Sequence, residues 1–75
     1  MPFIEMSGHT LLRLVTEGGP SPDELAEVGV TGKSIVRVNH EGDIELRRRD
    51  RWDVIGGLLG EFEERVKKET GLDWA

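Results

Sequence analysis

The stretch SIVRVNHEGDIELRR, residues 34–48, decides the fold of this chain. It contains two runs rich in β-branched and apolar residues, 34–39 and 43–48, separated by the tripeptide His-Glu-Gly. A three-residue loop that ends with a glycine in the left-handed conformation is a common connection between two antiparallel strands. We therefore predict a β-hairpin that turns at Gly42.

The side-chain pattern of this hairpin specifies its register. A turn at residues 40–42 places Val38 opposite Ile44, and the next apolar residues of the two strands also face each other on that side. On the other side it places Arg37 opposite Glu45. Cross-strand pairs of like polarity or opposite charge stabilise a sheet, and a slip of one residue would destroy both features. One face of the hairpin is thus expected to be apolar and the other charged.

Residues 51–70 show the period of an amphipathic helix. Asp50 is a suitable N-cap, and Gly71 is a suitable left-handed residue after the last turn. We expect one long C-terminal helix over about 51–70 that packs on the apolar face of the sheet. Its apolar stripe, at steps of three and four, consists of Trp52, Ile55, Leu59, Phe62 and Val66.

The residues before the hairpin predict one short helix and an extended N-terminus. Ser21 and Glu24 form a capping box with Pro22 at the first helical position, which indicates a helix over about 22–28. Residues 2–6 are expected to be a strand, and residues 10–15 a second strand after a turn at 7–8, with a helical turn as the alternative. The predicted fold is a single small α+β domain over residues 1–75. It comprises a small antiparallel sheet, made of the hairpin 34–48 with an N-terminal strand or hairpin, and two helices.

The composition limits what can stabilise the domain. A chain of 75 residues buries only about 60% of its unfolded surface, so the core is marginal. The absence of cysteine excludes disulfides and cysteine-based zinc sites, which leaves oligomerisation as the remaining supplement. Because the sequence shows neither a signal peptide nor an apolar run long enough to span a bilayer, we expect a cytoplasmic protein that does not bind membranes.

Three glycines in the predicted C-terminal helix suggest a contact surface. Gly56, Gly57 and Gly60 would each cost up to about 1 kcal/mol relative to alanine in a helix. One explanation is that a second backbone packs closely there, either the domain's own sheet or another copy of the chain. The alternative is a break in the helix. The residues predicted for a protein interface are Trp52, Gly56, Leu59, Gly60 and Trp74.

A basic cluster indicates a second possible partner. Arginine side chains bind phosphates, and a neighbouring tryptophan can stack on a base. Two aspartates interrupt this cluster, however, and the net charge of −5 repels nucleic acid. The residues predicted for this less favoured nucleic-acid contact are Arg47, Arg48, Arg49 and Arg51.

The opening residues Met1-Pro2-Phe3-Ile4-Glu5-Met6 resemble the start of the small tautomerases that use an N-terminal proline as a base. The resemblance implies an enzymatic role for Pro2. Those enzymes follow the first strand with a long helix, which the Gly-Gly-Pro of residues 18–20 would interrupt here.

No other catalytic pattern is present in the sequence. Neither His9 nor His40 has a nucleophile at a suitable spacing, and no metal-ligand or phosphate-binding motif occurs. We therefore predict a non-enzymatic module that binds a partner protein or a second copy of itself through the C-terminal helix face. No cofactor or metal is expected. The alternatives are a nucleic-acid-binding regulator and a proline-based tautomerase.

Overall fold

A computed structural model describes residues 2–74 of the chain. The sheet has four strands in the order β1-β2-β3-β4, and all neighbouring strands are antiparallel. The fold is therefore a small α+β fold, as predicted. In chain order the elements are β1 (Phe3–Ser7), α1 (Gly8–Leu14), the short 3-10 helix η1 (Val15–Glu17), α2 (Pro22–Glu27), β2 (Ile35–Asn39), β3 (Asp43–Arg47), β4 (Trp52–Gly57) and α3 (Phe62–Thr70).

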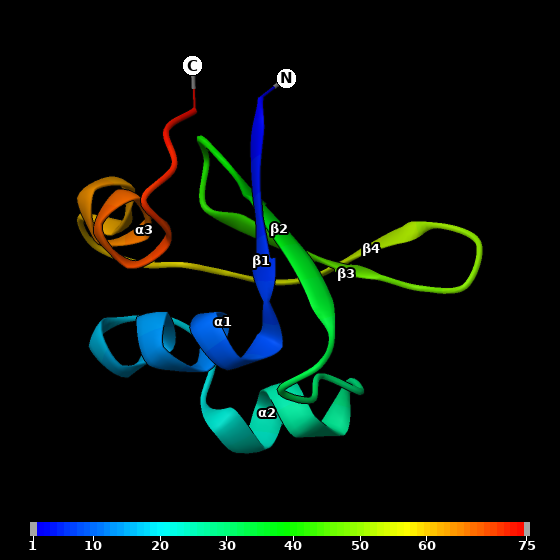
Figure 1. The fold of residues 1–75 in the computed structure, drawn as a ribbon. Helices are drawn as coiled ribbons and strands as arrows, with labels where there is room; N and C mark the ends of the chain where they lie inside the picture. The colour runs from blue at the N-terminus through cyan, green and yellow to red at the C-terminus, as the bar shows by residue number, and fades with distance from the viewer. Residues whose placement is uncertain (1, 75) are drawn as a thin grey trace.

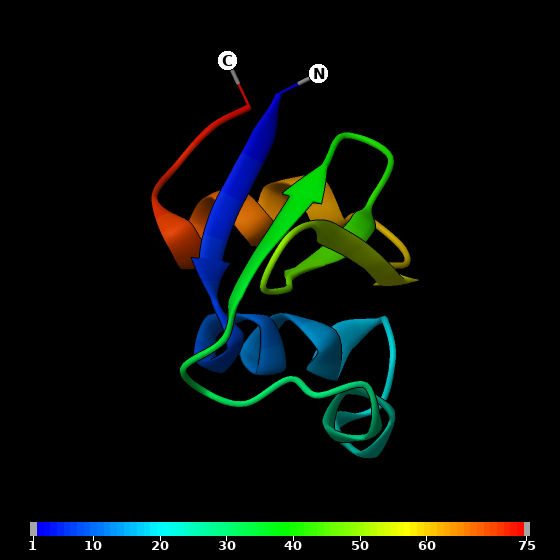
Figure 2. The ribbon, with the colours of Figure 1, turned by 90° about the vertical axis from the view of Figure 1, so that its right-hand side faces the viewer.

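The helices leave one face of the sheet uncovered. In Figure 1, α3 lies on one side of the strands and α1 crosses below them, while β3 and β4 project to the other side. Figure 2 shows β1 and β2 in front of α3, and within residues 2–74 no helix stands between these strands and the viewer. The covered face builds the core, to which the sheet contributes Ile4, Met6, Val36, Val38, Ile44 and Leu46 and the rest of the chain Leu11, Leu14, Val15, Leu25, Val30, Leu58, Val66 and Trp74.

The central hairpin has the predicted register. Val38 pairs with Ile44 on the buried face, and Arg37 pairs with Glu45 on the opposite face. The Arg37 guanidinium lies 2.7 Å from the Glu45 carboxylate. Gly42 has a φ of 86°, which is the left-handed conformation that the three-residue loop requires. The sequence pattern was sufficient here because strand period, turn chemistry and charge pairing all specify the same alignment.

Gly42→Ala is expected to lower the free energy of unfolding by about 1–2 kcal/mol. An L-residue pays this cost in the left-handed region. The new Cβ would also lie 3.0 Å from the Leu58 carbonyl oxygen and from the Phe62 ring. Urea denaturation measures the loss, and Gly57→Ala on the neighbouring strand is the control, because its Cβ would meet nothing closer than 3.8 Å. Equal stabilities of the two variants would contradict the assigned turn.

The short helix α2 also forms as predicted. The Ser21 side chain accepts a hydrogen bond from the Glu24 backbone N–H, and the Glu24 carboxylate accepts one from the Ser21 N–H. Pro22 occupies the first position, where the missing N–H has no intrahelical partner to lose. This helix buries one side chain, Leu25.

Residues 10–15 form a helix and not the favoured strand, so the turn predicted at residues 7–8 is wrong. Ser7 is the N-cap of α1, and its hydroxyl accepts a hydrogen bond from the backbone N–H of Thr10 at 3.2 Å. Leu11 and Leu14 are buried, at the three-residue spacing of a helix face. The apolar residues of this segment fit the period of a strand as well as that of a helix, and packing against the core selects the helix.

The long helix predicted over 51–70 is also wrong in its first half. Residues 52–57 form β4, and only Phe62–Thr70 is helical. The three glycines explain the difference, because a helix through them would lose up to about 1 kcal/mol at each, whereas β4 pairs with β3 at five positions. The pairing of β4 contains a bulge, since Glu45 faces Val54 while the adjacent Ile44 faces Gly56. The bulge adds one residue to β4 and so interrupts the strict two-residue alternation of its side chains. The resulting spacing of apolar residues resembles the period of a helix.

The chain after α3 returns to the core. Gly71 follows the helix in the left-handed conformation, with a φ of 72°, as predicted. Trp74 is only 4% exposed, and its indole N–H donates a hydrogen bond to the Val38 carbonyl oxygen at 3.2 Å. The last described residues are thus anchored to the central strand.

Candidate functional site

The uncovered face of the sheet, called the outer face below, combines charged, aromatic and aliphatic side chains. Ile35 and Val54 are 49% and 62% exposed, although both are large aliphatic residues. Exposed aliphatic side chains that share a sheet face with aromatic rings make this face a candidate contact surface. In β1, β2 and β3 the residues of the outer face alternate with the buried residues, and in β4 they are the partners of outer-face residues of β3. The outer face consists of Phe3, Glu5, Ile35, Arg37, Glu45, Arg47, Trp52 and Val54.

Arg37 organises the centre of the outer face. Its guanidinium carbon lies 3.7 Å from the Phe3 ring centroid and 4.2 Å from the Trp52 ring centroid. The Glu45 carboxylate holds the same guanidinium at 2.7 Å. Only 23% of the Arg37 side chain is exposed, so these contacts are largely screened from water. One arginine thus fixes the positions of two aromatic rings that come from the two edge strands.

Trp52 lies on the outer face, which corrects the predicted position of its side chain. The helix interpretation placed it against the apolar face of the hairpin. In the structure Trp52 pairs with Arg47, whose guanidinium carbon lies 5.6 Å from the indole centroid. The indole also contacts Arg37, on the face opposite to the core.

The four arginines of the basic cluster gather at one end of the sheet, where β3 turns into β4. Arg48 is bound within the turn, because its guanidinium holds the Asp53 carboxylate at 2.9 Å and 3.0 Å. Arg51 lies 3.8 Å from Asp50, and both are exposed. Arg47 and Arg49 are exposed, and neither makes an ion pair within the described part of the chain. This turn, residues 47–51, is called the arginine turn below, and Figure 1 shows that it projects away from α3.

The glycines predicted for an interface are not on one helix face. Gly56 lies on β4, where a Cβ would come within 2.8 Å of the Pro20 side chain. Gly60 lies in the loop before α3 with a φ of 71°, and Leu59 beside it is 65% exposed. Trp74 is buried in the core. Of the five residues predicted for a protein interface, only Trp52 lies on the outer face. The other four lie elsewhere in the structure and form no common surface with it.

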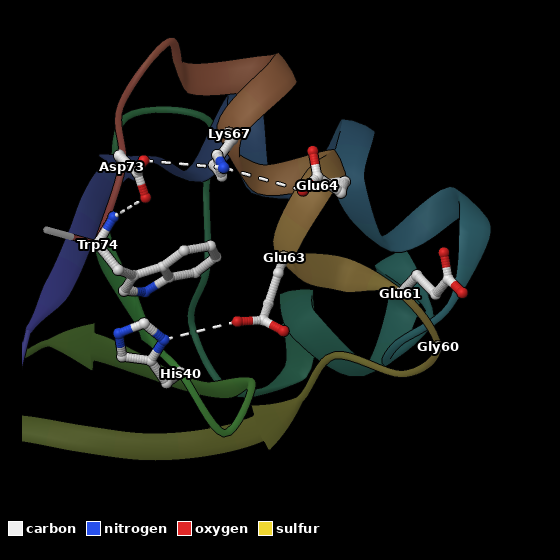
Figure 3. Close-up of a pocket in the computed structure, with 8 residues that line it drawn as sticks. All are labelled: His40, Gly60, Glu61, Glu63, Glu64, Lys67, Asp73 and Trp74. Atoms are coloured by element: carbon white, nitrogen blue, oxygen red, sulfur yellow. Dashed lines mark hydrogen bonds and ion pairs between the residues drawn. The ribbon is translucent and has the colours of Figure 1, made fainter.

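A hollow of about 440 Å³ lies between α3 and the loop of the central hairpin (Figure 3). The His40 Nδ1 lies 3.5 Å from the Glu63 carboxylate, and the His40 ring lies 5.3 Å from the Trp74 ring, centroid to centroid. Lys67 stands between Glu64 and Asp73, at 3.8 Å and 3.7 Å. The remaining lining residues are Gly60 and Glu61.

This hollow offers a histidine and several carboxylates but no nucleophile of the serine or cysteine type among its described lining residues. Within residues 2–74, no group of three metal-ligating side chains is placed to hold an ion. The sequence could not indicate the His40–Glu63 pair, because the two residues are far apart in the chain and meet only through the packing of α3.

Pro2, on which the resemblance to the tautomerases depends, is exposed immediately before β1. A helix does follow the first strand, but α1 ends at Leu14 and η1 at Glu17, before the Gly-Gly-Pro segment. The hollow beside His40 is not lined by Pro2.

Comparisons with known proteins give no family for the chain: no family model, no curated protein and no solved structure matches it. Among the described residues, no helix is long and apolar enough to cross a membrane.

Proposed function

We propose that this chain is a non-enzymatic interaction module that binds another polypeptide through the outer face of its sheet. The main support is that no helix of residues 2–74 covers one face of the four-stranded sheet, and that this face exposes Ile35 and Val54. The aromatic rings of Phe3 and Trp52 lie on the same face, held by Arg37. Aromatic residues and arginine are the types most enriched among the residues that dominate binding energy at protein interfaces.

This proposal keeps the interaction role expected from the sequence and moves it to another surface. The helix face with Gly56 and Gly60 does not form, because both residues precede α3. The outer face has what that helix face was expected to supply, namely a tryptophan beside exposed apolar side chains. It also carries matched charges, since Glu5 and Glu45 both face Arg37 across the strands.

The double variant Ile35→Gln with Val54→Gln is expected to abolish partner binding or self-association and to leave the fold intact. Both side chains are half exposed or more, so the free energy of unfolding should change by no more than about 0.5 kcal/mol per site. Two amide groups without hydrogen-bond partners would oppose the burial of this surface, and the net charge would not change. Sedimentation velocity of the purified chain measures self-association, and quantitative co-purification from the expressing cells measures partner binding.

Leu59→Gln is the matched control, because Leu59 is 65% exposed but lies outside the outer face. Association that persists in the control and disappears in the double variant supports the proposal. Equal losses in both variants, or a wild-type chain that stays monomeric and retains no specific partner, would contradict it.

A further inference from the structure

We propose that the polypeptide recognised by the outer face is an acidic segment with an apolar anchor: the anchor packs beside Val54 and Trp52, and its carboxylates bind the arginine turn. This inference rests on the proposed function and adds the chemistry of the partner. It depends on the position of the arginine turn next to the exposed part of β4.

The arginine turn is a local cationic site on an acidic molecule. The chain carries a net charge of −5, yet the turn contains four arginines and one aspartate. Arg48 is neutralised by Asp53, whereas the guanidinium groups of Arg47 and Arg49 have no carboxylate partner among the described residues. The planar guanidinium group matches a carboxylate with two parallel hydrogen bonds.

The charges on the rest of the surface favour the approach of an acidic segment at the arginine turn. α3 lies on the other side of the molecule, and its three glutamates are balanced by Arg65, Lys67 and Lys68. An acidic segment finds no excess of positive charge at α3 but is attracted to the arginine turn, and such charge complementarity orients the encounter and raises the association rate. The arginine turn is therefore the end of the molecule that favours an acidic partner.

The apolar part of the site lies within reach of the same segment. Arg47 pairs directly with Trp52, and Val54 follows two residues later on the same face of β4. Residues two apart in a strand are separated by about 7 Å. A short extended segment thus covers the distance from Val54 to the arginine turn. Val54 and Trp52 would pack against its apolar side chain.

Single-stranded nucleic acid fits the same surface less well. Base stacking needs open aromatic faces. The Trp52 ring already has the guanidinium carbons of Arg37 and Arg47 at 4.2 Å and 5.6 Å from its centroid. The exposed aliphatic groups of Ile35 and Val54 have no corresponding role in phosphate recognition. The observations therefore favour a polypeptide.

The test is a selection from a displayed library of random linear peptides against the full-length chain. Enriched peptides are expected to combine aspartate or glutamate with a nearby leucine, phenylalanine or tryptophan. Their affinities are then measured by fluorescence anisotropy for the wild type and for Arg49→Glu with Arg51→Glu. The double variant is expected to bind about tenfold or more weakly, with less difference at high salt.

A charge-matched control separates local contacts from net charge. Lys33→Glu with Lys68→Glu makes the same change in net charge at two exposed positions outside the arginine turn, and should alter the affinity by less than about twofold. Equal weakening in both double variants would overturn the inference. So would a selection that enriches no acidic peptides, or a labelled oligothymidylate that binds more tightly than the selected peptides.

The same peptides distinguish failure of this inference from failure of the proposed function. Peptides that lack acidic residues but lose binding in Ile35→Gln with Val54→Gln would overturn the partner chemistry and leave the outer face as the binding surface. Acidic peptides that bind the arginine turn and ignore the Ile35 and Val54 substitutions would overturn the proposed function.

Discussion

Trp74→Ala is expected to lower the free energy of unfolding by about 3–5 kcal/mol, the range for removal of a buried tryptophan. The side chain is 4% exposed and closes the core between α3 and the hairpin. Its ring meets Phe62 edge to face with the centroids 6.3 Å apart, and the variant would also leave the Val38 carbonyl without its indole donor. Since small domains have a total stability of about 5–15 kcal/mol, this loss would remove a large part of it. Urea denaturation followed by far-UV circular dichroism measures the effect.

Trp74→Phe is the control that isolates the hydrogen bond from the indole N–H to the Val38 carbonyl oxygen. Phenylalanine keeps aromatic packing near Phe62 and His40 but lacks the N–H that binds Val38. Its cost should be smaller than that of alanine, with about 0.5–1.5 kcal/mol for the lost hydrogen bond. A midpoint for Trp74→Ala within error of the wild type would show that the C-terminal residues are not part of the core.

Gly8→Ala is expected to cost about 3 kcal/mol or more, although the substitution adds one methyl group. A Cβ at this position would lie 1.9 Å from the carbonyl oxygen of Thr31. The obstacle is backbone and cannot rotate away. The first turn of α1 would have to shift and would strain the hydrogen bond from the Gly8 N–H to the Ser34 carbonyl, now 2.8 Å. Overpacking of a fixed site costs 1–3 kcal/mol and occasionally more. Thermal and urea denaturation both measure the loss.

Gly32→Ala is the matched control, because Gly32 belongs to the segment on which Gly8 packs. Its Cβ would meet only the His9 Cβ, at 3.9 Å, which is an ordinary contact. Its backbone is also outside the left-handed region. This variant should be as stable as the wild type, or slightly more stable because alanine restricts the unfolded chain. If Gly8→Ala behaves like Gly32→Ala, the contact between α1 and the segment before β2 is not as close as the structure shows.

The candidate site was only partly accessible from the sequence. The pairing of Arg37 with Glu45 followed from the hairpin register, and the arginine cluster was visible as a run. The contacts of Arg37 with Phe3 and Trp52 could not be predicted from the sequence, because they depend on which strands occupy the two edges of the sheet. The helix interpretation separated Arg51 from Arg47 by an element boundary, whereas the structure places them in one turn.

What the sequence by itself determined is local. The hairpin, α2 and the left-handed residue after α3 were predicted correctly, since each is specified by a few adjacent residues whose propensities agree. The capping box from Ser21 to Glu24 and the turn at Gly42 are of this kind. Their energetic preferences are satisfied within a few residues, so the rest of the molecule has little influence on them.

Tertiary structure alone decided the two ambiguous segments. Residues 10–15 and 52–57 have apolar spacings that suit either a strand or a helix, and local propensity does not separate the two. Residues 10–15 became helical because Leu11 and Leu14 fill the core from one helix face, with the Gly8 contact fixing the start. Residues 52–57 became a strand because β3 offered an unpaired edge, whose hydrogen bonds a glycine-containing helix could not match. That choice also created the outer face, since a long helix over 51–70 would have removed both β4 and the arginine turn.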